Sequence, residues 1–310
     1  MESLNRMAIE LVDEALEYAE ELNLDSEVLD CESTVIDFGI DVTGGVEAGL
    51  LLTEIQTAGL ATPRWELREL GSATVPYLTL TTDQPALALL CSQKAGWELE
   101  TDDFDGLGCG PARALVARED VFQRIDYVDA FDLTVLSVEA DQLPTDAAAE
   151  QVAAFADVAP TGVFLPVYPT ASVVGSITTA ARVAELATFA LFELGYDPSA
   201  IVTASGSAPV APVAEDEATA IARTTDALAY GGRAYLVVRE EFDGFEEIPS
   251  TASEAYGTPF VEIFDDLGWS FEDAPAELFG PATVTVDVLG GDTYTYGETD
   301  ESVLLESFDS

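Results

Sequence analysis

The stretch from Pro169 to Gly195, PTASVVGSITTAARVAELATFALFELG, is the feature that most constrains the fold. Ser172 is a favourable N-cap and Gly195 a favourable C-terminal stop, so the 22 residues between them predict one helix about 33 Å long. Small residues dominate the first half of this helix, which would let neighbouring backbone approach closely. Arg182 and Glu185 follow three residues apart and therefore share one helix face.

A lone Arg/Glu pair on a helix is most often a solvent-exposed salt bridge that contributes little to stability. Around this pair, however, the sequence is apolar, with Ile177, Ala184 and Phe189 among the neighbours on the same side. The pattern therefore predicts a buried pair. Because burying charge is costly, we expect a reason beyond stability for keeping Arg182 and Glu185.

The net charge of the chain limits its partners. It has 59 acidic and 11 basic residues, giving −48, while a hydrophobic content of 48% supplies enough apolar material for a core. Such a surface repels nucleic acid and anionic membranes. The acidic residues are scattered along the whole chain, which indicates a protein that works in very high salt. The alternative is an acidic protein that binds cations or basic partners.

Histidine is absent, which excludes a histidine base, a Ser-His-Asp or Cys-His unit and any histidine-ligated metal. Cys31, Cys91 and Cys109 are far apart and form no metal-binding spacing, so we expect no metal site and a reducing, cytoplasmic environment. The first residues, MESLNRMAIELVDE, are acidic and amphipathic, unlike a signal peptide, and no apolar run predicts a transmembrane helix.

Helix and strand patterns alternate irregularly, which predicts a mixed α/β (α+β) fold in two α/β domains, residues 1–157 and 158–310. The pattern leaves open that N- and C-terminal segments share a domain. Helices are expected over residues 3–22, 44–57, 85–93, 145–157 and 216–230. Strands are expected over 33–40, 74–81 (an edge strand, because of Pro76), 132–140, 161–167, 200–204 and 234–238, with a hairpin at 281–296. Residues 206–212 read as a loop, and the tail after Gly297 as loosely held.

Residues 102–111, DDFDGLGCGP, predict a glycine-rich turn before a helix at Ala112. Their spacing does not fit a dinucleotide-binding motif. One interpretation is a tight turn with Pro111 in the first helical position. The other is a helix N-terminus that holds an anionic group of a ligand, with Arg113 beside it.

Three segments follow one another along the chain in a recognisable order. The first is Gly108-Cys109-Gly110-Pro111-Ala112-Arg113-Ala114-Leu115, the second Thr170-Ala171-Ser172 with Gly175-Ser176 and Arg182-x-x-Glu185, and the third Gly206-x-Ala208-Pro209-Val210-Ala211-Pro212 with Thr225-Asp226 and Tyr230-Gly231-Gly232. Together they resemble the archaeal methenyltetrahydromethanopterin cyclohydrolases, here an acidic, halophile-type member, over most of the chain.

The resemblance implies hydrolysis of N5,N10-methenyltetrahydromethanopterin to the N5-formyl compound, in cytoplasmic one-carbon metabolism. It also implies a homotrimer with a pocket between the two domains of each subunit. The substrate is a cation with an electrophilic carbon, so water can attack it without a metal or organic cofactor. A chain without histidine needs a carboxylate as the base, and Glu185 is the candidate, with Arg182 to orient it.

The resemblance further implies that the carrier has an anionic tail. Lys94, the single lysine of the chain, and Arg113 are the cations expected near that tail. Gly108, Gly110, Thr170, Ser172 and Asp226 complete the expected substrate-binding residues. Lys94 also has a structural explanation, because a cation is favoured at the end of a helix. The alternatives are a non-catalytic pterin-binding paralogue and the same reaction on a folate-type carrier.

Overall fold

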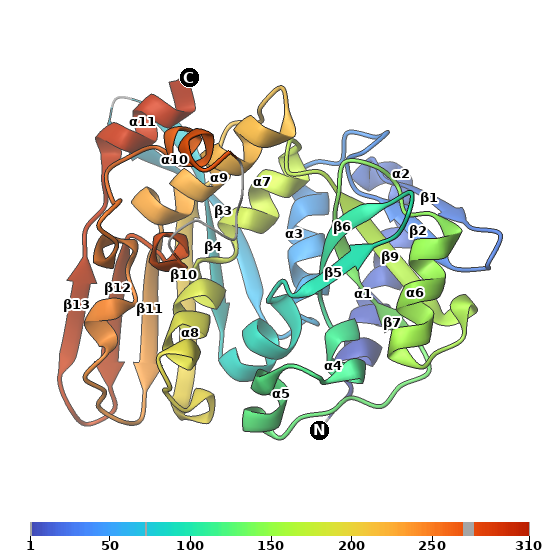
Figure 1. The fold of residues 1–310 in the computed structure, drawn as a ribbon, viewed down its shortest axis with the longest axis horizontal. Coiled ribbons are helices and arrows are strands. Elements are labelled where there is room, and N and C mark those ends of the chain that lie inside the picture. Colours follow the sequence, from blue (N-terminus) through green and yellow to red (C-terminus); the bar gives the residue numbers. More distant parts are fainter. Residues whose placement is uncertain (1, 72, 269–275, 310) are drawn as a thin grey trace. The chain divides into compact units, whose positions relative to one another are not determined.

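A computed structural model describes residues 2–71, 73–268 and 276–309, and its chain divides into two compact units (Figure 1). Unit 1 comprises Met1–Ala61 and Leu87–Thr178, and unit 2 comprises Thr62–Ala86 and Thr179–Ser310. Each unit combines helices with one sheet, so the expected α+β class is confirmed. In the described parts, no helix is long and apolar enough to cross a bilayer.

Unit 1 contains a seven-stranded sheet in the order β1-β2-β9-β8-β6-β5, with β7 also paired to β9. Its strands are β1 (Asp25–Val28), β2 (Thr34–Asp37), β5 (Trp97–Glu100), β6 (Asp105–Cys109), β7 (Thr134–Val135), β8 (Ser137–Glu139) and β9 (Val163–Tyr168). The central strand β9 runs parallel to β2, β7 and β8. Because β9 pairs within this sheet, the expected domain boundary at 157/158 lies inside unit 1.

Helices surround this sheet and bury its apolar side chains. They are α1 (Leu4–Glu17), α2 (Ala19–Leu22), α3 (Val46–Gln56), α4 (Ala112–Val116), α5 (Asp120–Ile125), α6 (Asp146–Ala156) and α7 (Val173–Ala180), with the π-helix η1 (Ala86–Gln93) and the 3₁₀ turn η2 (Pro160–Gly162). The fully buried Leu99, Leu136 and Leu165 belong to one core cluster, against which the apolar face of α6 packs.

Unit 2 contains a six-stranded sheet in the order β13-β12-β11-β10-β4-β3. Its strands are β3 (Thr62–Leu70), β4 (Ala73–Thr82), β10 (Ile201–Pro209), β11 (Arg233–Val238), β12 (Thr283–Val288) and β13 (Thr293–Gly297). All neighbours are antiparallel except β11 and β12. The expected hairpin at 281–296 is confirmed, with Gly290 at a φ of 77° in its turn.

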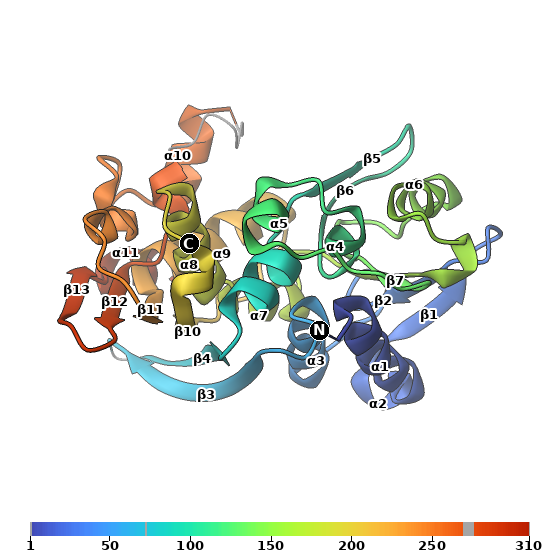
Figure 2. The ribbon, with the colours of Figure 1, turned by 90° about the horizontal axis from the view of Figure 1, so that it is seen from below.

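The helices of unit 2 are α8 (Val183–Glu193), α9 (Glu217–Gly231), α10 (Phe260–Asp266) and α11 (Glu301–Asp309), with 3₁₀ turns η3 (Pro198–Ala200), η4 (Phe245–Glu247), η5 (Ser250–Ala252) and η7 (Ala276–Phe279). Helices α8 and α9 cover one side of the sheet (Figure 2). Helix α11 packs on α9, with Val303 and Leu304 buried. The expectation of a loosely held tail after Gly297 is therefore wrong.

The predicted single helix from Ser172 to Gly195 is two helices. Helix α7 ends at Ala180, the chain turns through Ala181 and Arg182, and α8 begins at Val183. The turn is tight, because the N–H of Arg182 donates to the carbonyl of Thr179, only three residues back. No Gly or Pro marks this position in the sequence, so local patterns could not reveal the break.

Pairing explains three further differences from the expected elements. Strand β4 is internal, because β10 pairs with it on the side opposite β3, and Pro76 lies where the β10 register ends. Strand β10 continues through Gly206 to Pro209, a segment expected to be a loop. Residues 105–109 form strand β6, where a turn was expected, and only Gly110 has a positive φ, 106°, within the glycine-rich segment.

Candidate functional site

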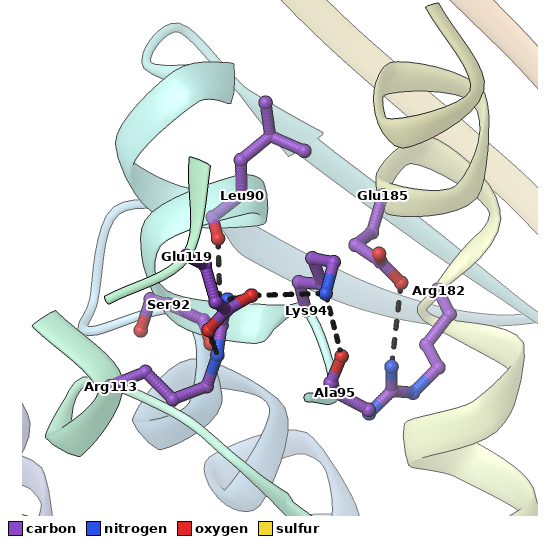
Figure 3. A network of polar contacts seen from close by, with 8 residues as sticks. All are labelled: Leu90, Ser92, Lys94, Ala95, Arg113, Glu119, Arg182 and Glu185. Carbon is purple, nitrogen blue, oxygen red and sulfur yellow. Dashed lines mark hydrogen bonds and ion pairs between the residues drawn. The ribbon is translucent and has the colours of Figure 1, made fainter. Parts of the chain in front are cut away.

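Glu185 is a buried carboxylate at the beginning of α8. Its side chain is 3% exposed, and Nη1 of Arg182 donates to its Oε2 at 3.4 Å (Figure 3). Arg182 is the N-cap residue of α8, so Glu185 lies in the first helical turn. The guanidinium and the helix N-terminus both favour a negative charge at this position. The predicted burial of the Arg182/Glu185 pair is confirmed.

Close backbone packing fixes the start of α8. A Cβ atom added to Gly206 on β10 would lie 2.4 Å from the backbone nitrogen of Ala184, so no other residue fits there without displacing the helix. A Cβ added to Gly232 would lie 3.3 Å from Val183 and 2.4 Å from the carbonyl oxygen of Leu228. These two glycines of the third sequence segment thus set the position of the turn that carries Glu185.

Lys94 lies in unit 1, directly after the π-helix η1, as its sequence context predicted. Its Nζ donates to Oε2 of Glu119 and to the carbonyl of Ala95, both at 3.1 Å (Figure 3). The same Glu119 accepts two hydrogen bonds from Arg113, at 2.8 Å from Nε and 2.7 Å from Nη2. Glu119 therefore joins two of the chain's few cations.

Arg113 is almost completely buried, with 1% of its side chain exposed. Its Nη1 donates to the carbonyls of Leu90 and Ser92 at 3.2 Å, and its guanidinium lies 5.5 Å from the ring centroid of Phe122. These contacts give Arg113 a structural role that orients Glu119. The prediction that Arg113 contacts the substrate's anionic tail stays a prediction.

Glu119 was not among the residues predicted from the sequence. Burial opposes its ionisation, but the hydrogen bonds and charges of Arg113 and Lys94 outweigh that effect and hold the pKa of Glu119 below its ordinary value. Gly96 leaves the space for this contact, because an added Cβ would lie 3.0 Å from Nζ of Lys94. In the sequence, Arg118-Glu119-Asp120 resembles a solvated charge run, and no local signal distinguishes it.

A pocket of about 430 Å³ opens beside this cluster within unit 1. Its lining includes Gly96, Trp97, Arg113, Arg118, Glu119 and Phe155. The guanidinium of Arg118 lies 5.4 Å from the centroid of Phe155, which in turn contacts Trp97 edge-on at 6.0 Å. The pocket combines aromatic surface with a cation, which suits a ligand carrying both an apolar and an anionic part.

Gly108 and Gly110 have packing reasons of their own. A Cβ added to Gly108 would lie 2.9 Å from the side chain of Leu136, and Gly110 needs its positive φ to donate its N–H to Ser92 at 2.8 Å. Helix α4, which follows, is only five residues long. The structural interpretation of the glycine-rich segment is thus supported, and substrate contacts by these glycines stay predictions.

Thr170 and Ser172 form the turn before α7. The hydroxyl of Ser172 accepts from the N–H of Gly175 at 2.9 Å and donates to the carbonyl of Pro169 at 2.8 Å, so the predicted N-cap is confirmed. Thr170 donates its hydroxyl proton to Glu139 at the end of β8. A Cβ added to Gly175 would lie 2.2 Å from the Pro169 carbonyl oxygen, which confirms the expected close backbone approach.

Asp226 lies elsewhere in unit 2, buried in the middle of α9. Its Oδ1 accepts from the N–H of Phe260 at 2.9 Å, and its Oδ2 accepts from the hydroxyl of Ser307 at 2.6 Å. It thereby joins α9 to the start of α10 and to α11. Burial raises the pKa of Asp226 to about 7, although both hydrogen bonds oppose the rise. These contacts favour a structural role for Asp226.

The sequence of the chain matches a known protein family over almost its whole length. A family model described as cyclohydrolase (MCH) matches residues 3–308. The methenyltetrahydromethanopterin cyclohydrolase of Halobacterium salinarum is 56% identical over 99% of both chains. This chain belongs to the methenyltetrahydromethanopterin cyclohydrolase family. Enzymes of the same name from Methanococcoides burtonii and Methanothermobacter marburgensis are 36% and 38% identical, each over 99% of this chain and 98% or 99% of their own.

The comparisons confirm the family that the three sequence segments indicated. The similarity runs through both units, and the acidic composition agrees with a relative from Halobacterium. The chain covers 98% or 99% of the length of these relatives, with Lys94 and Glu119 in one unit and Arg182 and Glu185 in the other.

Proposed function

We propose that this protein hydrolyses N5,N10-methenyltetrahydromethanopterin to N5-formyltetrahydromethanopterin, as a cytoplasmic homotrimer and without a metal or organic cofactor. The observation that carries the mechanism is the Arg182/Glu185 pair at the start of α8. A carboxylate that is 3% exposed and accepts a hydrogen bond at 3.4 Å from a guanidinium is held in one place beside an opposite charge. The reaction is the one that the names of the full-length relatives state.

Glu185 acts as the general base in this proposal. Water attacks the methenyl carbon, a carbon–oxygen bond forms, and the electron pair of the C=N⁺ bond returns to nitrogen. Glu185 accepts the proton that water loses. The carbon–N10 bond then breaks, the remaining hydroxyl becomes the N5-formyl carbonyl, and its proton ends on N10. The cation and one water therefore give the formyl compound and one released proton.

Arg182 is a positioning residue, because it acts through Glu185. Without the guanidinium, Glu185 would be a buried carboxylate with less compensation, and protonation would remove its ability to accept a proton. Lys94 is the residue that we propose for binding the substrate. Its ammonium is held by Glu119 beside the pocket that contains Arg118. We assign the anionic tail of the carrier to these cations.

The test follows loss of the methenyl chromophore with purified protein in molar KCl. Glu185→Gln should lower kcat by at least about 100-fold while the methenyl substrate still binds. Arg182→Ala should also lower kcat, and the double variant should lose less than the product of the two effects, because the two residues act as a unit. Glu193→Gln, an exposed position on the same helix α8, is the matched control and should retain wild-type turnover.

Three outcomes would contradict parts of the proposal. Turnover of Glu185→Gln near the wild-type rate would make Glu185 a structural ion-pair member. Binding of the methenyl compound without turnover by the wild type would indicate a non-catalytic pterin-binding paralogue. Faster hydrolysis of methenyltetrahydrofolate than of the methanopterin compound, offered in parallel, would assign a folate-type carrier.

A further inference from the structure

One face of the six-stranded sheet in unit 2 is exposed or half-buried over the register rows of Thr62 and Arg64. At the far end of β3 and β4 the same face is covered, because Leu70 and Val75 pack in a cluster with α9, α10 and α11. Helices α8 and α9 cover the other side, where Ala204, Leu236 and Val286 are buried (Figure 2). Alternate residues of each strand point away from these helices. One register row of this outward face consists of Thr62, Thr81, Ser205, Tyr235, Thr285 and Thr295.

Hydroxyl side chains dominate this outward face and hydrogen-bond to one another across the strands. Ser205 donates to Thr81 at 3.1 Å, and the hydroxyls of Thr285 and Thr295 lie 3.1 Å apart. Tyr235 is 43% exposed near the middle of the row. The face therefore offers an ordered set of short polar groups and one large aromatic side chain.

The charge of this face differs from that of the chain as a whole. At its outward positions, three arginines, Arg64, Arg68 and Arg233, stand against two carboxylates, Glu66 and Asp287. The strand positions of the face thus sum to +1 in a chain of net charge −48 and hold three of the eleven basic residues, while Glu301 of α11 adds one carboxylate near Tyr77 at the edge of the face. An ordinary solvated face of this protein is acidic, as on α1, where Glu10, Asp13, Glu14 and Glu17 are exposed.

Both carboxylates of the face already have partners on it. Glu66 forms an ion pair with Arg68, while Asp287 accepts hydrogen bonds from Tyr235 at 3.3 Å and Thr293 at 3.1 Å. The exposed guanidiniums of Arg64 and Arg233 therefore give the face its positive character. Tyrosine and arginine are also the side chains that are enriched in protein interfaces.

We propose that this outward face, from β3 across to β13, binds a second copy of this chain. Two copies with a charge of −48 repel each other wherever their acidic surfaces meet. This face carries few carboxylates, so an approaching copy meets little repulsion here. Arg64 and Arg233 complement the acidic surface that a neighbouring copy presents. The proposal deepens the homotrimer put forward above by assigning one of its contact surfaces, and it does not depend on the catalytic roles.

The test introduces two negative charges into this face. Thr81 and Thr295 are both exposed and lie on β4 and β13, which do not pair, so Thr81→Glu/Thr295→Glu places no new carboxylates opposite each other. Ser26→Glu/Gln123→Glu adds the same charge at exposed positions in unit 1 and serves as the matched control. Light scattering during size-exclusion chromatography in 2 M KCl then compares each mass with the monomer mass of 32.9 kDa. Thermal unfolding of each variant checks that it is folded.

The wild type and the control pair should both be oligomeric, and Thr81→Glu/Thr295→Glu should raise the dissociation constant at least about tenfold. An unchanged mass of the folded Thr81→Glu/Thr295→Glu variant across dilution would overturn the proposal, as would a monomeric wild type. Equal dissociation of the control pair would assign the effect to net charge and also refute it. If the double variant does not fold, Thr295→Glu alone decides by the same criterion. Turnover of the wild type, assayed in parallel, reports separately on the proposed reaction.

Discussion

Substitution of Asp226 by asparagine should change how the stability of the protein depends on pH. Burial raises the pKa of Asp226 from 3.8 to about 7 in the folded protein, and the side chain is 1% exposed, so solvent screens it little. One pKa unit corresponds to 1.36 kcal/mol, so the raised pKa amounts to a free-energy difference on the order of 4 kcal/mol.

The sign of the change in stability with pH follows from the number of protons that the folded and unfolded chains bind. Between pH 4 and 7 the folded protein keeps the Asp226 proton that the unfolded chain releases, so the contribution of this group to stability is full below pH 4 and is lost as the pH rises to about 7. The substituted asparagine would be neutral at every pH, and its amide oxygen could still accept from the N–H of Phe260. The free energy of unfolding of Asp226→Asn minus that of the wild type should therefore rise from pH 4.5 to 7.5 and then level off.

Urea unfolding in constant 2 M KCl at several pH values measures this difference. Because the net charge of both proteins changes almost equally with pH, subtraction removes most of the global electrostatic effect. Asp216→Asn is the control at the start of the same helix α9: Asp216 is exposed, and hydrogen bonds from Thr219 lower its pKa, so its effect should not vary between pH 5 and 8. A difference for Asp226→Asn that stays constant over this range would refute the reasoning.

Three other predictions concern charge. The thermal midpoint should rise between 0.1 and 2 M KCl, because salt screens the repulsion within a chain of net charge −48; a midpoint that stays level in a calorimeter would contradict this. Lys94→Gln should raise KM several-fold with kcat nearly intact, whereas Arg6→Gln, which removes an exposed cation, should change neither. Glu119→Gln should lower the free energy of unfolding by about 3 kcal/mol, because it removes the carboxylate that neutralises the buried guanidinium of Arg113, and should raise KM as Lys94→Gln does. Unchanged urea stability of Glu119→Gln would show that the ion cluster is not structural.

Local signals in the sequence predicted much of the fold. The N-cap at Ser172, the hairpin around Gly290 and the strand at Arg233–Val238 depend on residues close together in the chain, and each is present. The break after Ala180 was missed because the contact that fixes it, Gly206 against Ala184, joins residues more than twenty positions apart. The internal position of β4 depends on pairing with β10 and has no local signal either.

In the candidate site, too, the residues with a local sequence signal were predicted and those that depend on contacts between distant segments were not. Arg182 and Glu185 could be found because a charged pair stands in an apolar helix, and Lys94 because it is the single lysine. Glu119 could not be found, because only the folded chain brings it to Arg113 and Lys94. Asp226 was expected to bind substrate, but its hydrogen bonds to Phe260 and Ser307 depend on helices whose packing the sequence did not reveal.

The path of the chain between the two units sets an order for folding during synthesis. The hairpin of β3 and β4 is made early, yet β10, its partner in the sheet, leaves the ribosome about 120 residues later, on the order of 10 s at usual rates of translation. During that interval the edge of β4 that later pairs with β10 has unsatisfied backbone groups, which makes the nascent chain prone to strand-to-strand aggregation. Unit 1 can complete its sheet with β9 before this pairing occurs. Expression hosts that translate slowly or lack high intracellular salt should therefore lose this protein to aggregation through unit 2 first.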